Sequence, residues 1–474
     1  MNNNKKQTII ETNTTKKDGQ YVCPNCGASE ISFNEKLGKL YCNYCATTFD
    51  GNKLDNQIVT NLDNLEGNII GSGAQNIKAD TKDIITLKCG GCGAEVVIDT
   101  KTTTQARCHW CRSVLSINSR IENGAVPDAI LPFSIKKEEA KQEIEKFVGK
   151  RKFYALPKFK EEFTTENVMG VYFPYMLVDA KAKCEFIGEG EHLIKSYRID
   201  DTTYYDASLH SINRKFDILI DNLTIESNKD RINKKDENKT NNIINSIMPF
   251  DTENCISFQS NYLVGYTSEK RDINITELDD KVTKQLKDIT RHALNKDLTF
   301  YNRGIRWDKE EVNIVGTQWL AVYLPVWLYS YREVKNGKPT IHYVAVNART
   351  KETMGSVPIN MPLLLAISTI IEIVLGTLGI FLFLITNTSS DDDPSVIFLL
   401  LLASGFVYYS VMYAKYRNKE ARHSYEKETT NKITYEVKTD KHIKDNKKQT
   451  RRMMKGANNT RLEGEADFIN QIKK

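Results

Sequence analysis

Eight cysteines form one spacing pattern that the chain uses twice. Each set has two CxxC pairs separated by 15 residues, and the sets are Cys23, Cys26, Cys42, Cys45 and Cys89, Cys92, Cys108, Cys111. A CxxC pair is a short knuckle that directs two thiolates at one position, and the gap is long enough for a β-hairpin that returns the second pair. Four thiolates in a tetrahedron suit Zn²⁺ and leave no open position for catalysis. The spacing therefore predicts two structural Zn²⁺ sites, each in a zinc ribbon.

The residues around these cysteines agree with zinc sites but leave other chemistry open. Gly27 and Gly93 follow the second cysteine of their leading knuckles, where glycine tolerates a positive φ angle most easily. His109 lies inside the last knuckle and could replace one thiolate, although four cysteines already complete the site. Disulfide bonds or a redox-active CxxC pair are the other interpretations of the spacing. Cys184 and Cys255 belong to neither set, and we expect buried thiols in a reducing compartment.

No recognisable catalytic motif is present in the sequence. The seven histidines are scattered, and none lies in an HExxH or GxSxG setting. The sequence therefore predicts a binding protein rather than an enzyme. An enzymatic alternative requires a deep pocket in the central part of the chain, lined by several of Asp179, Glu185, Glu189, His192 and His342.

Two apolar stretches predict a transmembrane hairpin at residues 359–414. Residues 362–385 hold 24 positions with one charge, and residues 396–414 hold 19 with none, so each is long enough to cross a bilayer core. The loop between them contains three aspartates and no basic residue, whereas basic residues follow the second stretch at once. The positive-inside rule then predicts a two-pass protein of the inner (cell) membrane with both termini in the cytosol.

Glu372 is the one charged residue within the first apolar stretch. An ionised carboxylate at such a depth costs roughly 2.5 kcal/mol or more. Glu372 is therefore either an oligomer contact or polar anchor for a partner helix, or a carboxyl that stays protonated or bonds a hydroxyl such as that of Thr369. Its role stays open at this point.

The central residues predict an α+β domain with an antiparallel sheet over residues 121–358. One expected helix follows Pro132-Phe133-Ser134 and carries Ala140, Ile144, Phe147 and Val148 on one face. A second helix begins near residue 275, with a capping box before an apolar repeat that ends at residue 293. Residues 171–177 and 322–328 are expected strands that resemble each other, and a meander follows with a turn at residues 336–337.

The remaining segments complete a multi-domain fold class: two small β zinc ribbons, an α+β cytosolic domain with antiparallel sheet, and a two-helix transmembrane hairpin. The ribbons are expected at residues 21–50 and 86–120, with a linker at 51–85. Residues 1–20 read as disordered, residues 226–244 as a charged mobile insertion, and residues 415–474 as a basic cytosolic tail.

The basic charge of the chain is concentrated in that tail. Residues 415–474 hold 17 Lys and Arg against 9 Asp and Glu, whereas the whole chain carries only +5. Because the tail emerges beside the apolar stretch, anionic lipid headgroups are a nearer partner for it than nucleic acid; a solvated tail is the alternative. The ribbons lack the concentrated basic surface that phosphate contacts require, so nucleic acid is the less favoured partner.

Several segments in a fixed order carry a resemblance to a known family. These are the two ribbons, the apolar segment, and the motifs Pro132-Phe133, Tyr172-Phe173-Pro174, Met248-Pro249-Phe250-Asp251, Tyr262-Leu263-Val264-Gly265-Tyr266 and Leu324-Pro325-Val326-Trp327. Together they resemble the bacterial membrane proteins described as transcription factor IIB-type zinc ribbon-containing proteins. The resemblance implies a membrane anchor in an envelope-stress (phage-shock) module, with flotillin-like and coiled-coil proteins as partners. The basic tail and the charged insertion depart from the usual pattern and put the identity of those partners in doubt.

The sequence thus favours a cytosol-facing membrane adaptor, or scaffold, that acts by binding other membrane-associated proteins. Its docking faces would be the two zinc ribbons and the α+β domain. The main alternative is a membrane-tethered nucleic-acid-binding or transcription-associated factor, and the third is an enzyme with a site in the central domain.

Overall fold

The computed structural model describes most of the chain between the first cysteine set and the C-terminal strand. Its described residues are 7–10, 23–26, 28, 31–34, 37, 39–50, 62–75, 84–89, 93–99, 106–110, 114–115, 120–121, 127–199, 202–228, 247–258, 260–263, 265–269, 271–335, 338–386, 401, 403–416 and 429–449. The predicted insertion at 226–244 and the turn at 336–337 lie largely outside these residues.

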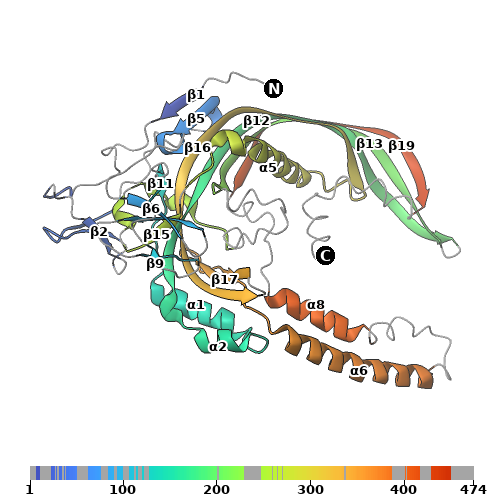
Figure 1. The fold of residues 1–474 in the computed structure, drawn as a ribbon. Coiled ribbons are helices and arrows are strands. Elements are labelled where there is room, and N and C mark those ends of the chain that lie inside the picture. Colours follow the sequence, from blue (N-terminus) through green and yellow to red (C-terminus); the bar gives the residue numbers. More distant parts are fainter. Residues whose placement is uncertain are drawn as a thin grey trace.

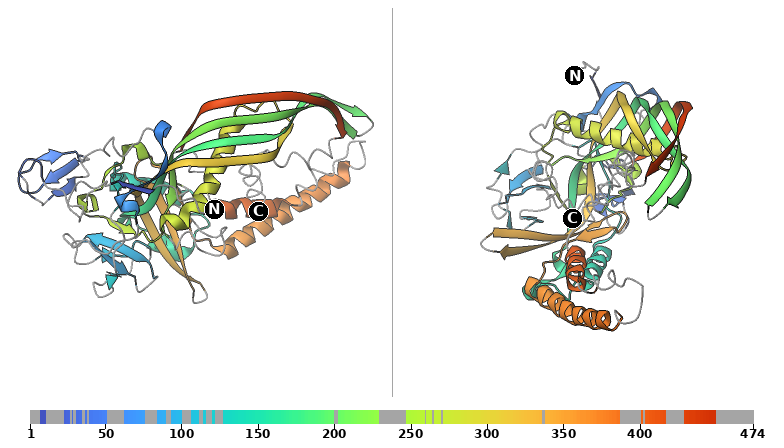
Figure 2. Two further views of the ribbon diagram at one scale, coloured as in Figure 1. Left: turned by 90° about the horizontal axis from the view of Figure 1, so that it is seen from above. Right: turned by 90° about the vertical axis from the view of Figure 1, so that its right-hand side faces the viewer.

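Four very long antiparallel strands dominate the protein. They are β12 (Met169–Ile199), β13 (Thr202–Glu226), β16 (Gly304–Lys335) and β19 (Thr430–Gln449), in the spatial order β16-β12-β13-β19. Beyond the body of the molecule they continue side by side as a curved arm (Figure 1; Figure 2, left). We call this four-stranded extension the arm.

Shorter strands complete a 14-stranded sheet whose main path runs β1-β5-β16-β12-β15-β7-β6-β10. They are β1 (Gln7–Ile10), β5 (Gly67–Gly71), β6 (Ile84–Lys88), β7 (Glu95–Asp99), β10 (Arg120–Ile121), β11 (Ala129–Ile130), β14 (Ile256–Ser257), β15 (Thr267–Glu269), β17 (Lys338–Asn347) and β18 (Thr353–Gly355). Segments expected to be disordered or linking thus contribute strands: β1 pairs with β5, and β5 pairs with β16.

The α-helices among the described residues are α1 (Lys137–Gly149), α2 (Pro157–Glu162), α5 (Ile275–Asn295), α6 (Met361–Thr386) and α8 (Ser404–Tyr416). The predicted apolar face of α1 is confirmed, since Ala140, Ile144, Phe147 and Val148 are all buried. The start of α5 is confirmed too: the backbone N–H of Asn274 donates to the Glu277 carboxylate at 3.2 Å. The buried face of α5 packs under the arm (Figure 1).

The predicted fold class is wrong, because the protein is mostly β and its helices lie around one continuous sheet. The missed signal is an alternation of period two along the arm. Ala182, Cys184 and Phe186 are buried, whereas Lys183 between them is exposed, which is the pattern of a half-buried strand. The two similar segments at 171–177 and 322–328 are indeed strands, and they pair with each other, Phe173 opposite Leu324.

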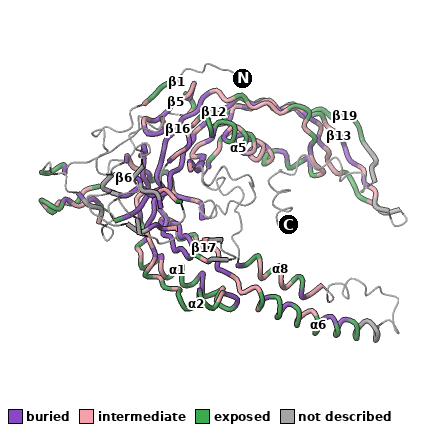
Figure 3. Tube along the Cα trace, viewed as in Figure 1, coloured by how far each residue is buried: buried purple, intermediate pink, exposed green. Residues whose placement is uncertain are grey.

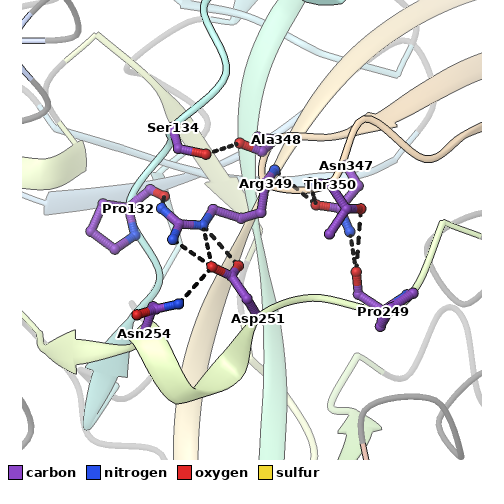
Figure 4. A network of polar contacts seen from close by, with 9 residues as sticks. All are labelled: Pro132, Ser134, Pro249, Asp251, Asn254, Asn347, Ala348, Arg349 and Thr350. Atoms are coloured by element: carbon purple, nitrogen blue, oxygen red, sulfur yellow. Dashed lines mark hydrogen bonds and ion pairs between the residues drawn. The ribbon is translucent and has the colours of Figure 1, made fainter.

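A polar network fastens the strand end at residue 347 to two other segments (Figure 4). The Arg349 guanidinium donates to both carboxylate oxygens of Asp251, at 2.8 Å for Nε to Oδ1, and its Nη1 donates to the backbone oxygen of Pro132 at 3.1 Å. The Asn347 amide donates to the backbone oxygens of Ile247 and Pro249. These bonds hold the Met248-Pro249-Phe250-Asp251 motif against the sheet.

The predicted two-helix transmembrane hairpin and the two-pass inner-membrane topology are wrong. Among the described residues one helix meets the length and hydropathy criteria for a membrane span, at Met361–Leu382 in α6, with mean hydropathy 2.3. Helix α8 has 13 residues, about 20 Å at 1.5 Å per residue, against a bilayer core of about 30 Å. Its last residue, Tyr416, is buried in the body, and the Tyr416 hydroxyl accepts a hydrogen bond from the Tyr154 backbone N–H at 3.0 Å. Residues 387–400 lie outside the described residues.

Helix α6 is largely exposed, unlike the core helix of a globular domain. Only 22 % of its most apolar window is buried, and Ile370, Ile373 and Phe381 are each about 60 % exposed (Figure 3). An apolar helix face of this size requires a covering that the described residues do not supply.

Glu372 anchors α8 to α6. Its carboxylate Oε2 accepts hydrogen bonds from the backbone N–H groups of Gly405 at 2.6 Å and Phe406 at 3.3 Å, in the first turn of α8. A carboxylate at a helix N-terminus satisfies unpaired N–H groups and complements the helix dipole. Gly405 permits the approach, because a Cβ there would lie 2.4 Å from the Ser368 backbone oxygen. The structure thus shows Glu372 as a polar anchor for a helix of its own chain, which differs from the partner-helix role considered from the sequence.

Replacing Glu372 with leucine is expected to loosen the start of α8 by about 1–2 kcal/mol, the size of a lost helix cap. Glu372→Gln keeps one acceptor oxygen and is expected to lose less than half of that. Hydrogen exchange of peptides covering residues 403–409 measures the difference. Equal exchange in wild type and Glu372→Leu would contradict the anchor.

Candidate metal centres

The first cysteine set converges on one point, as the spacing predicts. Strands β2 (Ile31–Asn34), β3 (Lys39–Cys42) and β4 (Thr48–Phe49) form a small antiparallel sheet, ribbon 1. One knuckle precedes β2 and the other follows β3, so both lie at the open end of the β2–β3 hairpin. The sulfurs of Cys23 and Cys45 lie 3.6 Å apart, as do those of Cys26 and Cys42, and all four sulfurs lie within 4.8 Å of one another. Four sulfurs at about 2.3 Å from a central Zn²⁺ would have such separations.

The same two backbone hydrogen bonds occur in a knuckle of each cysteine set. The N–H of Cys42 donates to Thr47 and the N–H of Ala46 donates back to Cys42, both at 2.9 Å. In the second set, Cys89 and Gly93 make the same two bonds at 2.8 Å, with Ala94 in the place of Thr47. Gly93 has φ of 78° and Ala46 has φ of 58°, so the predicted positive φ is confirmed at Gly93, while Gly27 lies outside the described residues.

The pKa values of two thiols in ribbon 1 are shifted in opposite directions. Hydrogen bonds from Thr47 lower the pKa of Cys45 to about 6. The pKa of Cys26 is affected most by the backbone at Ala28, which lowers it, but burial and the neighbouring sulfurs outweigh this and raise it to about 12. A bound cation would lower the pKa of every thiol in the cluster, because it stabilises all four thiolates together.

The second cysteine set is described in part. Cys89 and Cys108 are both buried, and their knuckles adjoin the β6–β7 hairpin and the pair β8 (Ala106–Arg107) and β9 (Val114–Leu115). Cys92 and Cys111 lie outside the described residues. The structure therefore shows one four-cysteine cluster that can hold a metal ion, and the second site stays a prediction. Cys184 and Cys255 are buried, as expected, and burial raises the pKa of Cys184 to about 12.

The last knuckle of the second set is inserted into the protein core. His109 is 1 % exposed, and its Nε2 lies 3.0 Å from Oε1 of Glu269 on β15, which is itself 3 % exposed. The Trp110 indole N–H donates to the same carboxylate oxygen. The Trp110 ring meets Phe173 and Tyr343 edge-on, at centroid distances of 6.0 and 5.4 Å. His109 is thus part of a buried polar contact, the Glu269 socket.

Ribbon 1 presents the corresponding position to solvent. Tyr44 follows Cys42 by two residues, as Trp110 follows Cys108, yet Tyr44 is 80 % exposed. Leu37 is 58 % exposed. The two ribbons, alike in spacing, therefore have opposite surroundings: the second is built into the sheet, and the knuckle of the first is uncovered.

The residues of the enzymatic alternative do not meet. Glu185 pairs with Lys215 and Lys309, which lower its pKa to about 2, and Glu189 pairs with Arg306 at 2.6 Å. Each of the other three contacts a residue outside the proposed set. His192 bonds the Phe300 backbone oxygen, His342 pairs with Glu333, and Asp179 lies beside Asp221. A small pocket of about 190 Å³ between α5 and β19 is lined by none of them.

Asp179 makes stability depend on pH. Burial, followed by the neighbouring Asp221 carboxylate, raises the pKa of Asp179 to about 8, although the N–H of Asn222 donates to it at 2.9 Å. A carboxyl with a raised folded-state pKa stabilises the protein below its unfolded pKa of about 4, and this stability is lost as pH rises toward 8.

Asp179→Asn is therefore expected to stabilise the protein at pH 9 by about 1–2 kcal/mol and to leave it nearly unchanged at pH 4. The gain is smaller than the full pKa shift implies, because Asp179 keeps part of its surface in contact with solvent. Urea unfolding at the two pH values measures it. A gain of equal size at both would contradict the assignment.

Comparison with known proteins gives one distant relative. The chain is 25 % identical to the "Uncharacterized protein YdjG" of Bacillus subtilis (strain 168) over 348 residues, which are 72 % of this chain and 90 % of that protein. No known protein-family profile matches the chain, and no solved structure matches it.

Proposed function

We propose that the protein is a cytosol-facing adaptor that docks membrane-associated proteins through ribbon 1 and is held at a membrane by α6. The observation that carries the proposal is the contrast between equivalent knuckle positions. Trp110 is partly buried, packs against two aromatic rings and is bonded to a carboxylate, whereas Tyr44 is 80 % exposed. An amphipathic ring at an exposed rigid knuckle is the kind of residue that acts as a binding hot spot.

The Glu269 socket also indicates what a partner of ribbon 1 offers. Within this chain the last knuckle of the second cysteine set contacts aromatic rings and one carboxylate. A partner site of the same chemistry would accept the Tyr44 ring and its hydroxyl, with Leu37 as a second apolar contact. Zn²⁺ in both cysteine sets would fold the ribbons, since modules of this size cannot hold a core alone.

The surroundings of α6 support the membrane part of the proposal. Its exposed apolar face fits a lipid environment better than water. A basic loop lies beside the start of α6, where the Asn360 N–H donates to the Tyr154 backbone oxygen at 2.8 Å. Arg151 in this loop donates from Nε to the backbone oxygen of Lys415 at 2.8 Å, and Lys150 and Lys152 are exposed beside the 64 % exposed Phe153. Such residues favour anionic headgroups, each cation contributing about 1 kcal/mol. A role in envelope stress, with flotillin-like and coiled-coil partners, rests on the family resemblance alone.

The test is affinity capture of the full-length protein from nuclease-treated membranes, with bound proteins identified by mass spectrometry. Leu37→Ser/Tyr44→Ser is expected to lose the membrane-associated partners while it keeps its zinc. Ile194→Ser is the matched control, because Ile194 is a 53 % exposed apolar residue on the arm. Capture that survives the double variant contradicts docking by ribbon 1. Capture that depends on omitting the nuclease favours a tethered nucleic-acid-binding factor.

A further inference from the structure

Three of the seven histidines gather on one face of the arm. His192 lies on β12, His210 on β13 and His442 on β19. The strand register places His210 directly opposite His442, so their side chains share a face of the sheet. Their ring centroids are 5.2 Å apart and the rings are inclined by 72°. Two imidazoles at this separation can direct one nitrogen each at a common ion.

The hydrogen bonds of this pair leave nitrogens for an ion. His442 Nε2 donates to Oδ1 of Asp445 at 2.9 Å, so the unprotonated nitrogen of the neutral ring is Nδ1. A histidine that ligates a metal ordinarily donates its other N–H to a carboxylate or carbonyl in this manner. His210 Nδ1 is buried and, within the described part of the chain, has no hydrogen-bond partner. A buried nitrogen of this kind requires an explanation.

The pair has both cations and a carboxylate in its surroundings. Lys441 and Lys444 flank His442 on β19 and are exposed to solvent. The guanidinium of Arg214, on the same strand as His210, is paired with Asp440, whose Oδ2 accepts from Nη2 at 2.8 Å. The Asp440 carboxylate is also close enough to His210 for the two to interact electrostatically. A carboxylate near the pair favours a bound cation.

We propose that His210 and His442 bind one divalent first-row transition metal ion, of the class of Zn²⁺, Ni²⁺ and Cu²⁺, with water in the other positions. Imidazole nitrogens suit these ions and do not suit Mg²⁺ or Ca²⁺. The ion joins β13 to β19, and β19 is an edge strand of the arm within the described residues. Metal binding therefore fastens β19 to β13 within the arm, a property independent of the docking function proposed above.

His192 is outside this site although it lies nearby. Its ring stacks on Phe300 at 4.0 Å, and its Nδ1 donates to the Phe300 backbone oxygen at 2.7 Å. The ring of Phe300 also meets His210 edge-on, at 5.7 Å. Among the described residues, the four cysteines of ribbon 1 are the one group of three or more metal-binding side chains within 4.8 Å. His192 thus provides a matched control on the same face of the arm.

The test titrates Ni²⁺ into the full-length protein whose cysteine sets are already loaded with Zn²⁺, following heat of binding, zinc release and hydrogen exchange. One Ni²⁺ is expected to bind without zinc release and to slow exchange in residues 430–449. His442→Ala, at a 52 % exposed side chain, is expected to weaken binding about tenfold or more, and His192→Ala to leave it unchanged. Equal binding by wild type and His442→Ala, or Ni²⁺ uptake matched by zinc release, overturns the proposal.

Discussion

Replacing Cys42 with serine is expected to remove one zinc ion per chain and to unfold ribbon 1 while the large sheet stays folded. Cys42 is fully buried, and the buried apolar residues that ribbon 1 itself supplies are Cys23, Ile31, Leu40 and Cys42, which pack with residues of the body in one cluster. A module with so small a core gains its stability from metal, and a structural Zn²⁺ site in isolated zinc fingers contributes about 10–16 kcal/mol. Metal analysis and hydrogen exchange over residues 39–50 measure the loss.

The control for this variant is Cys184→Ala, which removes a buried thiol outside both sets and is expected to keep the full zinc content. Because the four sulfurs form one tetrahedron, Cys23→Ser is expected to give the same loss as Cys42→Ser. Protection of residues 39–50 in the absence of the metal would contradict the account, since it would mean that ribbon 1 folds by its own packing.

Replacing Glu269 with alanine is expected to destabilise the body of the protein by about 3–5 kcal/mol. The carboxylate of Glu269 receives the Trp110 indole N–H, lies 3.0 Å from His109 Nε2, and accepts from the Asn228 amide at 3.2 Å. Removing it takes away a buried acceptor that these donors share, and a buried group that loses its bond costs more than the bond itself contributes. Urea unfolding of the zinc-loaded protein measures the change.

Glu333→Ala is the matched control, because Glu333 also pairs with a histidine, His342, at 3.0 Å. That pair keeps about a fifth of its side-chain surface in contact with solvent, so its loss is expected to cost about 1 kcal/mol. Glu269→Gln keeps one acceptor oxygen and is expected to fall between the two. Equal losses for Glu269→Ala and Glu333→Ala would show that the second ribbon is not held by its carboxylate socket.

The features that were predicted correctly from the sequence depend on local spacing. The four cysteines of ribbon 1, the buried face of α1 and the start of α5 are all determined by residues within one or two turns or one hairpin. The predicted meander after residue 328 is confirmed for the same reason, Arg332 on β16 lying opposite Ile341 on β17. In each case a short segment carries its own geometric requirement.

The features that were missed depend on contacts across long stretches of chain. Strand β19 has Ile433, Val437 and Ile443 among many lysines, too weak an alternation to indicate a strand without its partner β13. Glu269 lies 160 residues from His109, so no local pattern indicated that the second ribbon is inserted in the core. Hydropathy detected the apolar residues before and after residue 390, but not that α8 is short and held by Glu372.

The two ribbons are equal in spacing and unequal in setting, and this difference is the basis of the docking function proposed here. The most direct test is zinc content during a slow chelator challenge of the full-length protein, after dialysis into metal-free buffer, with hydrogen exchange read in parallel. We expect two zinc ions per chain. The first is lost together with the exchange protection of residues 39–50. The second is lost more slowly, together with the exchange protection of residues 106–110. One zinc ion per chain, or earlier loss of protection at residues 106–110, would contradict it.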